Sequence, residues 1–560
     1  MSTIVRSRPA GIASVWPALR RLADFRPEMT VERLALIAAG FFTLFCNGAF
    51  FRAVSGTGAL HGHWSTAVSL VAMVGSLNVL LLCLLLNRWT AKPLLIALLL
   101  VTSVAAHFMS QYTVYLDADM IRNILHTDGK ESGELVSAGM LPSLLTLGVL
   151  PSLMVWRVRL RHRAMGRAVM VRGAWVLLAV MVASGAALGS FQNLSALMRN
   201  HRELRHLVTP GNYLVSLGRV LADDQAGKHR PRTPLGINAH IAGRPMEARP
   251  RLLVLVVGET VRAQNWGLNG YARQTTPELS RLAPINFTQV SSCGSATEVS
   301  VPCMFSPWGR AHYDKDRVKH SESLLHVLEH AGIHTLWRDN QTGCKGVCDG
   351  LAFESFEHAS VPKVCDAEGC MDEVMLQGLA GAVDRRNGDV VVVLHQLGNH
   401  GPAYYKRYPT HLRRFTPVCE TSELGDCSQQ QIVNAYDNAV LHTDEFLAST
   451  IRMLAAQTDR DTALIYLSDH GESLGENGLY LHGVPYAIAP ETQTRVPMVM
   501  WLSSGFAASR GIDMQCMKRE AQAPASQDNL FHSVLGLMQV STPEYDGQRD
   551  LFRACSSAAG

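Results

Sequence analysis

Charged residues are scarce in this 560-residue chain: only 18% are Asp, Glu, Lys or Arg, while 47% are hydrophobic. This composition excludes an intrinsically disordered or collagen-like chain. The 51 basic residues exceed the 47 acidic ones by only 4, and no helix-turn-helix, zinc-finger or RNA-recognition signature is present. We therefore expect no nucleic-acid partner. Because a typical domain has about 100–200 residues, we expect at least two structural units.

Two common catalytic motifs are missing as well. No G-x-x-x-x-G-K-[ST] loop is present to bind the phosphates of a nucleotide donor. No G-x-S-x-G turn is present to carry a serine nucleophile. The chemistry of this chain must therefore reside elsewhere.

Cysteine is absent between Cys83 and Cys293, and the remaining ten cysteines follow residue 290. Eight of these form four close pairs, Cys293 with Cys303, Cys344 with Cys348, Cys365 with Cys370, and Cys419 with Cys427. Such density predicts disulfides in an oxidising compartment. A structural zinc site is the alternative for the second and third pairs. Cys516 and Cys555 form a fifth pair or stay free.

The first 200 residues contain five apolar stretches, each long enough to cross a bilayer as a helix. They are residues 34–51, 65–86, 93–109, 138–156 and 173–191. One such stretch could be a buried core helix, but five in succession predict a membrane domain. We do not expect the first stretch to be a removable signal peptide, because it begins too far from the N-terminus and lacks a small-residue cleavage site.

Basic residues in the short connections predict the orientation, because Lys and Arg are retained on the cytoplasmic side. Arginine and lysine cluster before the first stretch, between the second and third, and between the fourth and fifth. Residues 110–137 instead contain five acidic residues against Arg122 and Lys130. We expect a cytoplasmic N-terminus and, after five crossings, an exported region from residue 192 onward.

The sequence pattern divides the chain into three parts. A membrane domain is predicted for residues 1–192. Residues 193–249 are predicted to form an amphipathic bridging helix followed by a linker rich in Arg, Pro, Gly and His. The helix either lies on the membrane surface or only connects the two domains. From residue 250 onward an α/β domain is predicted, because the short apolar runs 252–257, 390–394 and 463–467 are typical of buried parallel strands. Helical patterns at 321–331 and 431–454 lie between them.

Polar side chains that can bind metal follow each of these predicted strands. Glu259 follows the first strand, His395 and His400 follow the second, and Asp469 and His470 follow the third. Ligands of such sheets bind at the carboxyl ends of the strands, where these residues should meet. Carboxylates and imidazoles are suitable ligands for zinc or manganese. A single such residue is more often structural, but several together predict a site.

Five sequence segments resemble those of the lipid A phosphoethanolamine transferases, which include the mobile colistin-resistance enzymes. The segments are GET-x-R at 258–262, SCGSATEVSVPCMFS at 292–306, RDNQTGCKGVCDG at 338–350, HQLGNHGPAYY at 395–405 and SDHGESLGENGLYLHG at 468–483. The resemblance extends over essentially the whole chain. It implies five membrane helices followed by a periplasmic domain with the alkaline-phosphatase or sulfatase fold and a mostly parallel sheet.

The resemblance also implies roles for individual residues. Thr297 matches the nucleophile, and it matches the Zn²⁺ site together with Glu259, Asp469 and His470. Residues that match those around the phosphoryl group are Lys345, His395, His400 and His482. Two positions depart from the family pattern: Ser295 replaces a threonine, and Glu298 replaces a small residue directly after the nucleophile. We expect a change in substrate preference there.

The implied function is zinc-dependent transfer of phosphoethanolamine from phosphatidylethanolamine to a lipid A phosphate, with a covalent threonine intermediate and release of diacylglycerol. We expect a monomer in the bacterial inner membrane that confers polymyxin resistance. One alternative is transfer to a core sugar or a surface protein, and another is hydrolysis by a sulfatase-like enzyme or phosphodiesterase. The C-x-P-x-R run of sulfatases is absent after Cys303, which disfavours a sulfatase. A membrane-anchored binding protein would not need the complete set of site residues.

Overall fold

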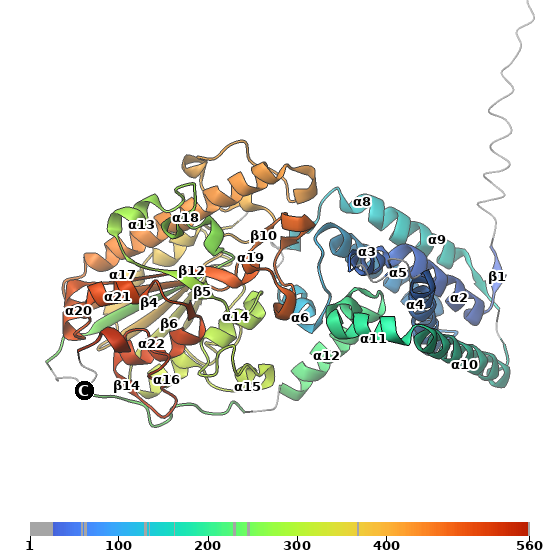
Figure 1. Cartoon of the computed structure of the whole chain (residues 1–560), viewed down its shortest axis with the longest axis horizontal. Helices are drawn as coiled ribbons and strands as arrows, with labels where there is room; N and C mark the ends of the chain where they lie inside the picture. The colour runs from blue at the N-terminus through green and yellow to red at the C-terminus, as the bar shows by residue number, and fades with distance from the viewer. Residues whose placement is uncertain are drawn as a thin grey trace, which may run out of the picture. The chain divides into compact units, whose positions relative to one another are not determined.

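The structure is a computed structural model that describes residues 26–57, 60, 64–127, 132–133, 135–161, 163–227, 231–243, 247–366 and 369–557. The basic leader, as far as residue 25, lies outside this part of the chain. The described residues belong to two compact units (Figure 1). The first unit includes residues up to 110 and residues 138–215, and the second includes residues 111–137 and everything from 216 onward.

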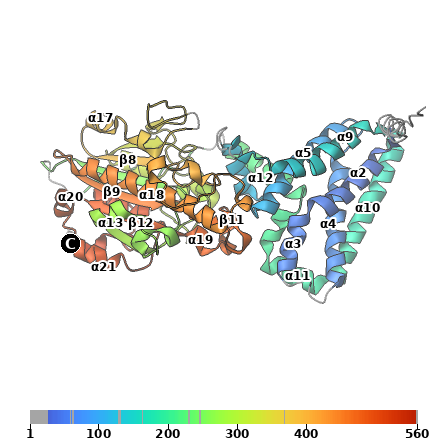
Figure 2. The same ribbon diagram turned by 90° about the horizontal axis from the view of Figure 1, so that it is seen from above.

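The first unit is built from long apolar helices (Figure 2). Four continuous helical segments are long and apolar enough to span a membrane: α4 (Trp64–Leu85), α5 (Ala91–Gln111), the segment Met140–Arg157, and α10 (Met165–Gly189). The first predicted span is bent by 47° between Val31–Cys46 and Gly48–Gly56. Counting this bent pair as one span gives the five predicted crossings. Their large exposed apolar surfaces are typical of helices that face lipid.

Residues 111–137 belong to the second unit although two membrane helices flank them. Their main helix, α6 (Ala118–His126), begins at Asp117, whose side chain accepts a hydrogen bond from the Met120 backbone at 2.8 Å. Before α6, the Tyr112 hydroxyl donates to the Ser422 carbonyl at 3.0 Å. Helix α6 also contacts α14 (Thr297–Met304). This insertion therefore contributes residues to the soluble unit.

The second unit is organised around an eight-stranded sheet with the order β13-β5-β12-β9-β4-β8-β6-β7. The five consecutive strands from β9 to β7 in this order run parallel to one another. Strand β12 is antiparallel to both of its neighbours, β5 and β9. The strands are β4 (Arg251–Gly258), β5 (Ile285–Ser291), β6 (His334–Asp339), β7 (Phe353–Ser355), β8 (Val390–His395), β9 (Asp461–Ser468), β12 (Arg495–Leu502) and β13 (Ala525–Ser526). The three predicted strands and the mostly parallel sheet are confirmed.

Helices cover both faces of this sheet (Figure 1). Helices α13 (Pro277–Leu282) and α18 (Gln429–Ala455) lie on one face, and α14, α16 (Leu324–His330) and α22 (Asp528–Met538) lie on the other. Strands β4, β8 and β9 are buried along their whole length, as the continuous apolar runs predict. Leu253, Leu255 and Val257 of β4 point into the same core as α16 and α22. The sheet is therefore a rigid support for the loops at its carboxyl edge.

Part of the predicted linker 222–249 has regular structure. Helix α12 continues to Gly227, and His240–Ile241 forms β3, which pairs antiparallel with β14 (Val540–Ser541). Leu235 is buried in the core of the second unit. The segment lacks an apolar period, but backbone pairing and one buried side chain hold this part of it against the sheet domain.

Five disulfides stabilise the second unit. They join the four pairs expected from the sequence, and Cys516 with Cys555, whose pairing the sequence left open. The zinc alternative for the two central pairs is therefore wrong, because all four sulfurs are bonded to each other in pairs. Cys46 and Cys83 are free and buried in the membrane unit.

Candidate active site

Two neighbouring strands bring the predicted metal-binding carboxylates together. Glu259 directly follows β4, and Asp469 directly follows β9, and these strands are paired in register up to Gly258 and Ser468. Both carboxylates are completely buried. Buried carboxylates are costly unless a cation or several donors stabilise them. Their proximity thus indicates a site for a positively charged group.

His470 completes the cluster from the same loop. Its Nε2 atom lies 3.3 Å from Asp469 Oδ2 and 3.6 Å from Glu259 Oε1. The Nδ1 atom is 2.9 Å from the Gly471 carbonyl oxygen, to which it donates a proton. The imidazole therefore presents the Nε2 lone pair to the two carboxylates, which is the tautomer that a metal ligand requires.

Thr297 lies at the first position of α14 and faces this cluster. Its hydroxyl is 3.2 Å from Glu259 Oε2 and 3.3 Å from His470 Nε2. The side chain is buried, with 3% exposed. A hydroxyl at the start of a helix benefits from the partial positive charge of the helix terminus, which favours its deprotonated form. The structure thus places the predicted nucleophile beside the predicted ligands.

The four residues fit a divalent metal by their chemistry. One ligand atom each from Glu259, Asp469 and His470 lies within 4.8 Å of the others. Asp469 Oδ1 accepts hydrogen bonds from the Thr260 and His470 backbones, whereas its buried Oδ2 has no hydrogen-bond partner among the described residues. A buried carboxylate oxygen without a donor indicates a position for a cation. Two carboxylates, one imidazole and one hydroxyl are hard to borderline ligands, which suit Zn²⁺ or Mn²⁺.

His482 and His400 extend the site on one side. The His482 ring packs against His470 at a tilt of 44° with a centroid separation of 4.3 Å, and the His400 ring centroid is 5.8 Å from that of His482. Burial, and then the neighbouring charges of His482 and Arg407, lower the pKa of His400 well below its ordinary value. His400 is therefore neutral near pH 7, and it can exchange a proton with a bound group rather than carry a fixed charge.

A network that the sequence did not reveal orients His482. Glu472 is completely buried and accepts hydrogen bonds from His482 Nδ1 at 2.8 Å and from the Tyr404 hydroxyl at 2.6 Å. Gln341 was missed as well, and its amide donates to Glu259 Oε2 at 3.3 Å. Glu472 lies within the SDHGES segment, so its closeness in sequence to Asp469 and His470 could have indicated that it belongs to the site.

Lys345 and the unusual Glu298 lie together beside Thr297. Lys345 Nζ donates to the Thr342 hydroxyl at 2.5 Å and lies 3.7 Å from Glu298 Oε1. Glu298 Oε1 also accepts from His126 Nδ1 of α6 at 2.7 Å. Burial alone would raise the pKa of Glu298, but the His126 hydrogen bond and the Lys345 charge outweigh it, so this pKa lies below its ordinary value. The departure from the family pattern thus forms an ionised contact between α6 and α14.

His395 has a different environment from the other predicted residues. It is completely buried at the end of β8, its Nδ1 atom is 2.7 Å from Asp339 Oδ1, and its ring packs against Trp337. Its Nε2 atom makes no hydrogen bond with any described residue. The assignment of His395 to substrate binding remains a prediction.

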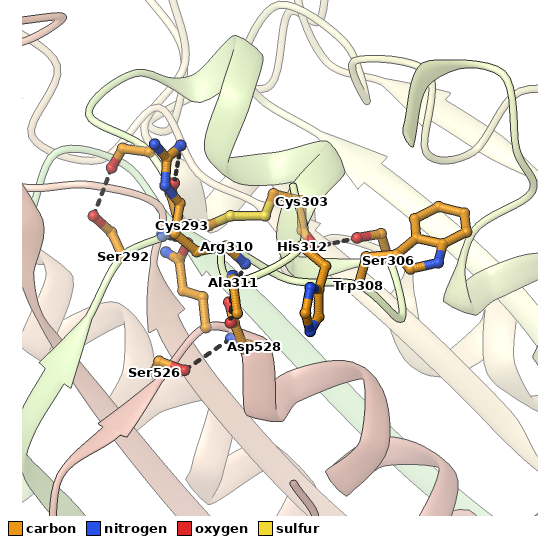
Figure 3. The surroundings of a disulfide bond; sticks show 12 residues. Ser292, Cys293, Cys303, Ser306, Trp308, Arg310, Ala311, His312, Ser526 and Asp528 are labelled. Carbon is orange, nitrogen blue, oxygen red and sulfur yellow. Dashed lines mark hydrogen bonds between the residues drawn. A yellow bond between two sulfur atoms is a disulfide. The ribbon is translucent and has the colours of Figure 1, made fainter. Parts of the chain in front are cut away.

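The segment that carries Thr297 is closed by the Cys293–Cys303 disulfide, whose surroundings are shown in Figure 3. Cys293 follows β5, and Cys303 lies near the end of α14, so the bond joins both ends of the segment that carries Thr297. The Cys293 backbone also donates to the Gln527 side chain at 2.6 Å, and Gln527 in turn donates to the Asp469 carbonyl at 2.6 Å. Nucleophile loop and metal-ligand loop are thus connected through one amide side chain.

Gly398 provides a test of how closely the loops must approach. It has a φ of +52°, and a Cβ at this position would lie 2.9 Å from the Glu259 carbonyl oxygen. We expect Gly398→Ala to lower the free energy of unfolding by about 1–3 kcal/mol and to displace Glu259, so that bound metal decreases. Gly388→Ala is the control, because φ there is +83° but no atom lies within 4 Å of the added Cβ. Thermal melting and metal analysis measure both effects, and equal metal content in the two variants would contradict this placement of Glu259.

Comparisons with known proteins agree with this geometry. A family model described as Sulfatase matches residues 251–540, and one described as Phosphoethanolamine transferase EptA/EptB matches residues 74–225. The phosphoethanolamine transferase EptA of Escherichia coli K12 is 38% identical over 545 residues, covering 96% of this chain and 99% of that protein. The chain belongs to the phosphoethanolamine transferase family.

Two further proteins support this membership of the family. The transferase is 37% identical to phosphatidylethanolamine transferase Mcr-1 of Escherichia coli, covering 85% of this chain and 90% of Mcr-1. The solved structure of the membrane-integral lipooligosaccharide phosphoethanolamine transferase A of Neisseria meningitidis superposes with a TM-score of 0.90 at 35% identity. That match covers 95% of this chain and 99% of the Neisseria chain. The predicted family is confirmed. The predicted architecture, a membrane-embedded helical part joined to a sulfatase-like domain, is also confirmed.

Proposed function

We propose that this transferase moves phosphoethanolamine from phosphatidylethanolamine to a phosphate of lipid A through a covalent intermediate on Thr297. The observation that carries the proposal is the buried Thr297 hydroxyl, which lies within 3.3 Å of both Glu259 and His470. The names of its relatives support the reaction class, because they are phosphoethanolamine transferases, and one of them is named for lipooligosaccharide. The catalytic unit is proposed to face the periplasm, where both lipids present their head groups.

The proposed cofactor is one Zn²⁺ held by Glu259, Asp469, His470 and Thr297. When bound, the ion would favour the threonine alkoxide and polarise a phosphoryl oxygen. Zinc is proposed over manganese on the family resemblance, since the ligand set suits either ion.

In the first step, Thr297 Oγ attacks the phosphorus of phosphatidylethanolamine, and its proton passes to Glu259 Oε2, to which the hydroxyl already donates. The bond from phosphorus to the glycerol oxygen breaks, and that oxygen takes the electron pair and the proton released by Thr297, leaving as diacylglycerol. The imidazoles of His400 and His482 are proposed to move that proton, and the Lys345 ammonium to offset charge on the phosphoryl oxygens. His395 is assigned to the same substrate-binding group with its ring fixed by Asp339.

In the second step, an oxygen of a lipid A phosphate attacks the phosphorus of the phosphoethanolamine-threonine. The bond from phosphorus to Thr297 Oγ breaks, and Oγ takes the electron pair and the proton that the attacking phosphate group gives up. The product carries an added amine, which offsets the negative charge of lipid A. Weaker attraction of cationic peptides follows from this electrostatic change, and it is the proposed basis of polymyxin resistance.

Hydrolysis is the competing reaction on the same fold, because the model that matches the catalytic residues is described as Sulfatase. An assay of the purified full chain in detergent with phosphatidylethanolamine and lipid A separates the two. The proposal predicts one diacylglycerol for each phosphoethanolamine-lipid A and little free phosphoethanolamine. Free phosphoethanolamine that accumulates equally with and without lipid A would show that water is the acceptor.

Relatives with another acceptor define a second outcome of this assay. Kdo(2)-lipid A phosphoethanolamine 7''-transferase of Escherichia coli K12 is 26% identical over 554 residues, covering 92% of this chain. Its identity is lower than the 38% of EptA, so transfer to the acceptor of that relative is kept as the second candidate. Fragmentation of the product by mass spectrometry assigns the added group to a phosphate or to a sugar.

A further inference from the structure

A large pocket in the second unit adjoins the helix of the nucleophile. Its volume is about 650 Å³, a size typical of sites for small-molecule ligands. Glu298 and Pro302 of α14 and Phe305 directly after it line the pocket on one side, and Arg122 and His126 of α6 line it on another. Lys345 lines the same pocket. The pocket therefore lies between the helix whose first residue is Thr297 and the insertion 111–137.

Arg122 is the exceptional residue of this pocket. Only 4% of its side chain is exposed, and none of its three guanidinium nitrogens donates a hydrogen bond to any described residue. The nearest carboxylate oxygens, of Asp119, Asp223 and Asp224, lie at 3.5, 3.5 and 4.0 Å, beyond good hydrogen-bond length. A buried guanidinium with five N–H groups and no acceptor is unfavourable unless another group supplies acceptors.

The other charged side chains of the pocket are already hydrogen-bonded. Lys319 donates to Asp224 at 2.7 Å and Arg232 donates to Asp349 at 2.7 Å. Lys315 bonds Asp119, Lys345 bonds Thr342, Glu298 accepts from His126, and Glu322 accepts from His330. Among the described lysines, arginines and acids that line the pocket, Arg122 alone has a charged group without a hydrogen bond. An incoming ligand can therefore accept hydrogen bonds from Arg122 without breaking an existing hydrogen bond, although the guanidinium is already ion-paired with Asp119, Asp223 and Asp224.

We propose that Arg122 binds the acceptor phosphate of lipid A in this pocket, beside the phosphoethanolamine-threonine. The inference rests on the proposed function and names the residue that holds its second substrate. A guanidinium can donate two parallel hydrogen bonds to a phosphate, and burial strengthens the charge interaction.

The second step explains why a cation is needed at this position. The intermediate on Thr297 is an anionic phosphodiester, and the attacking lipid A phosphate is also an anion. Like charges at short range repel, and a fixed guanidinium beside them offsets this repulsion. In the first step only one phosphate anion, that of the donor, is at the site, and the leaving group is uncharged diacylglycerol, so no second phosphate has to be neutralised. Arg122 should therefore serve the acceptor and have little effect on the donor.

Direct binding to a chain that cannot react tests this assignment. In the full-length Thr297→Ala protein in detergent, titration calorimetry measures the affinity for three probes: diphosphoryl lipid A, the same lipid without phosphates, and phosphatidylethanolamine. Adding Arg122→Gln should weaken binding of diphosphoryl lipid A by about tenfold or more. Affinity for the other two probes should change by less than about twofold. Arg122→Lys, which keeps the charge but loses the paired donors, should give an intermediate affinity.

Several results would overturn the proposal. Unchanged affinity for diphosphoryl lipid A in Arg122→Gln would do so, as would equal weakening for the lipid without phosphates. Weaker binding of phosphatidylethanolamine alone would reassign Arg122 to the donor. If the Thr297→Ala protein does not distinguish the phosphorylated lipid from the dephosphorylated one, both this proposal and the proposed acceptor fail. Arg281→Gln, an exposed change in α13, is the control for the loss of one positive charge.

Discussion

Replacing Thr297 with alanine should lower the rate of diacylglycerol release from phosphatidylethanolamine by at least about 10³-fold, because the attacking oxygen is removed. The protein should remain folded, since the Thr297 side chain contributes one small buried hydroxyl and its neighbours Glu259 and His470 are held by β4 and β9. The measurement is single-turnover release of diacylglycerol by the purified full chain, without an acceptor.

Two comparisons make this test specific. Thr297→Ser keeps a hydroxyl at the same position and should retain measurable release together with a phosphoethanolamine adduct on the peptide that contains residue 297. Thr450→Ala is the control, because its hydroxyl is equally buried but bonds the Phe446 carbonyl within α18, away from the site. Normal diacylglycerol release by Thr297→Ala would mean that another group attacks the donor.

Asp469→Asn should reduce bound metal by at least about tenfold and the transfer rate by about 10²–10³-fold. Asparagine has the shape of aspartate, and its carbonyl oxygen can still accept from the Thr260 and His470 backbones as Asp469 Oδ1 does. Its amide nitrogen, in place of the unpartnered Oδ2, cannot bind a cation. The substitution therefore removes the metal site with little change in packing.

Metal analysis and thermal melting, each with and without a chelator, measure this effect. Chelation should lower the melting temperature of the original chain, because it leaves the buried carboxylates of Glu259 and Asp469 close together without a cation. The Asp469→Asn protein should melt at the same temperature with and without chelator. Full metal content in this variant would contradict the assignment of Asp469 as a ligand.

The central strands and much of the site could be predicted from the sequence for physical reasons. Strands β4, β8 and β9 are buried on both faces, so their sequences are continuous apolar runs that stand out from the surrounding pattern. Polar residues directly after such strands must meet at one edge of the sheet. The structure brings Glu259, Asp469 and His470 together in this way.

Contacts between segments that are distant in the chain could not be predicted from the sequence pattern. Glu472 acts through His482 and Tyr404, which come from two different loops, and no sequence period relates them. The bend of the first membrane span was also hidden, because its composition is apolar on both sides of residue 47.

The contacts of the insertion 111–137 are the clearest example of contacts that the sequence pattern does not predict. Its acidic residues indicated a loop outside the membrane. The sequence gives no indication that α6 contacts α14, or that Arg122 lines a pocket with Glu298 and Lys345. Such placement depends on how a loop between two membrane helices packs on a distant part of the chain.

The central claim is transfer of phosphoethanolamine to a lipid A phosphate by way of Thr297, and mass spectrometry of lipid A from expressing cells tests it most directly. Cells that make this chain are compared with cells that make equal amounts of the Thr297→Ala variant. The account predicts a phosphoethanolamine adduct on a lipid A phosphate in the first and none in the second. Unmodified lipid A in both, with folded and metal-loaded protein in the membrane, would contradict it.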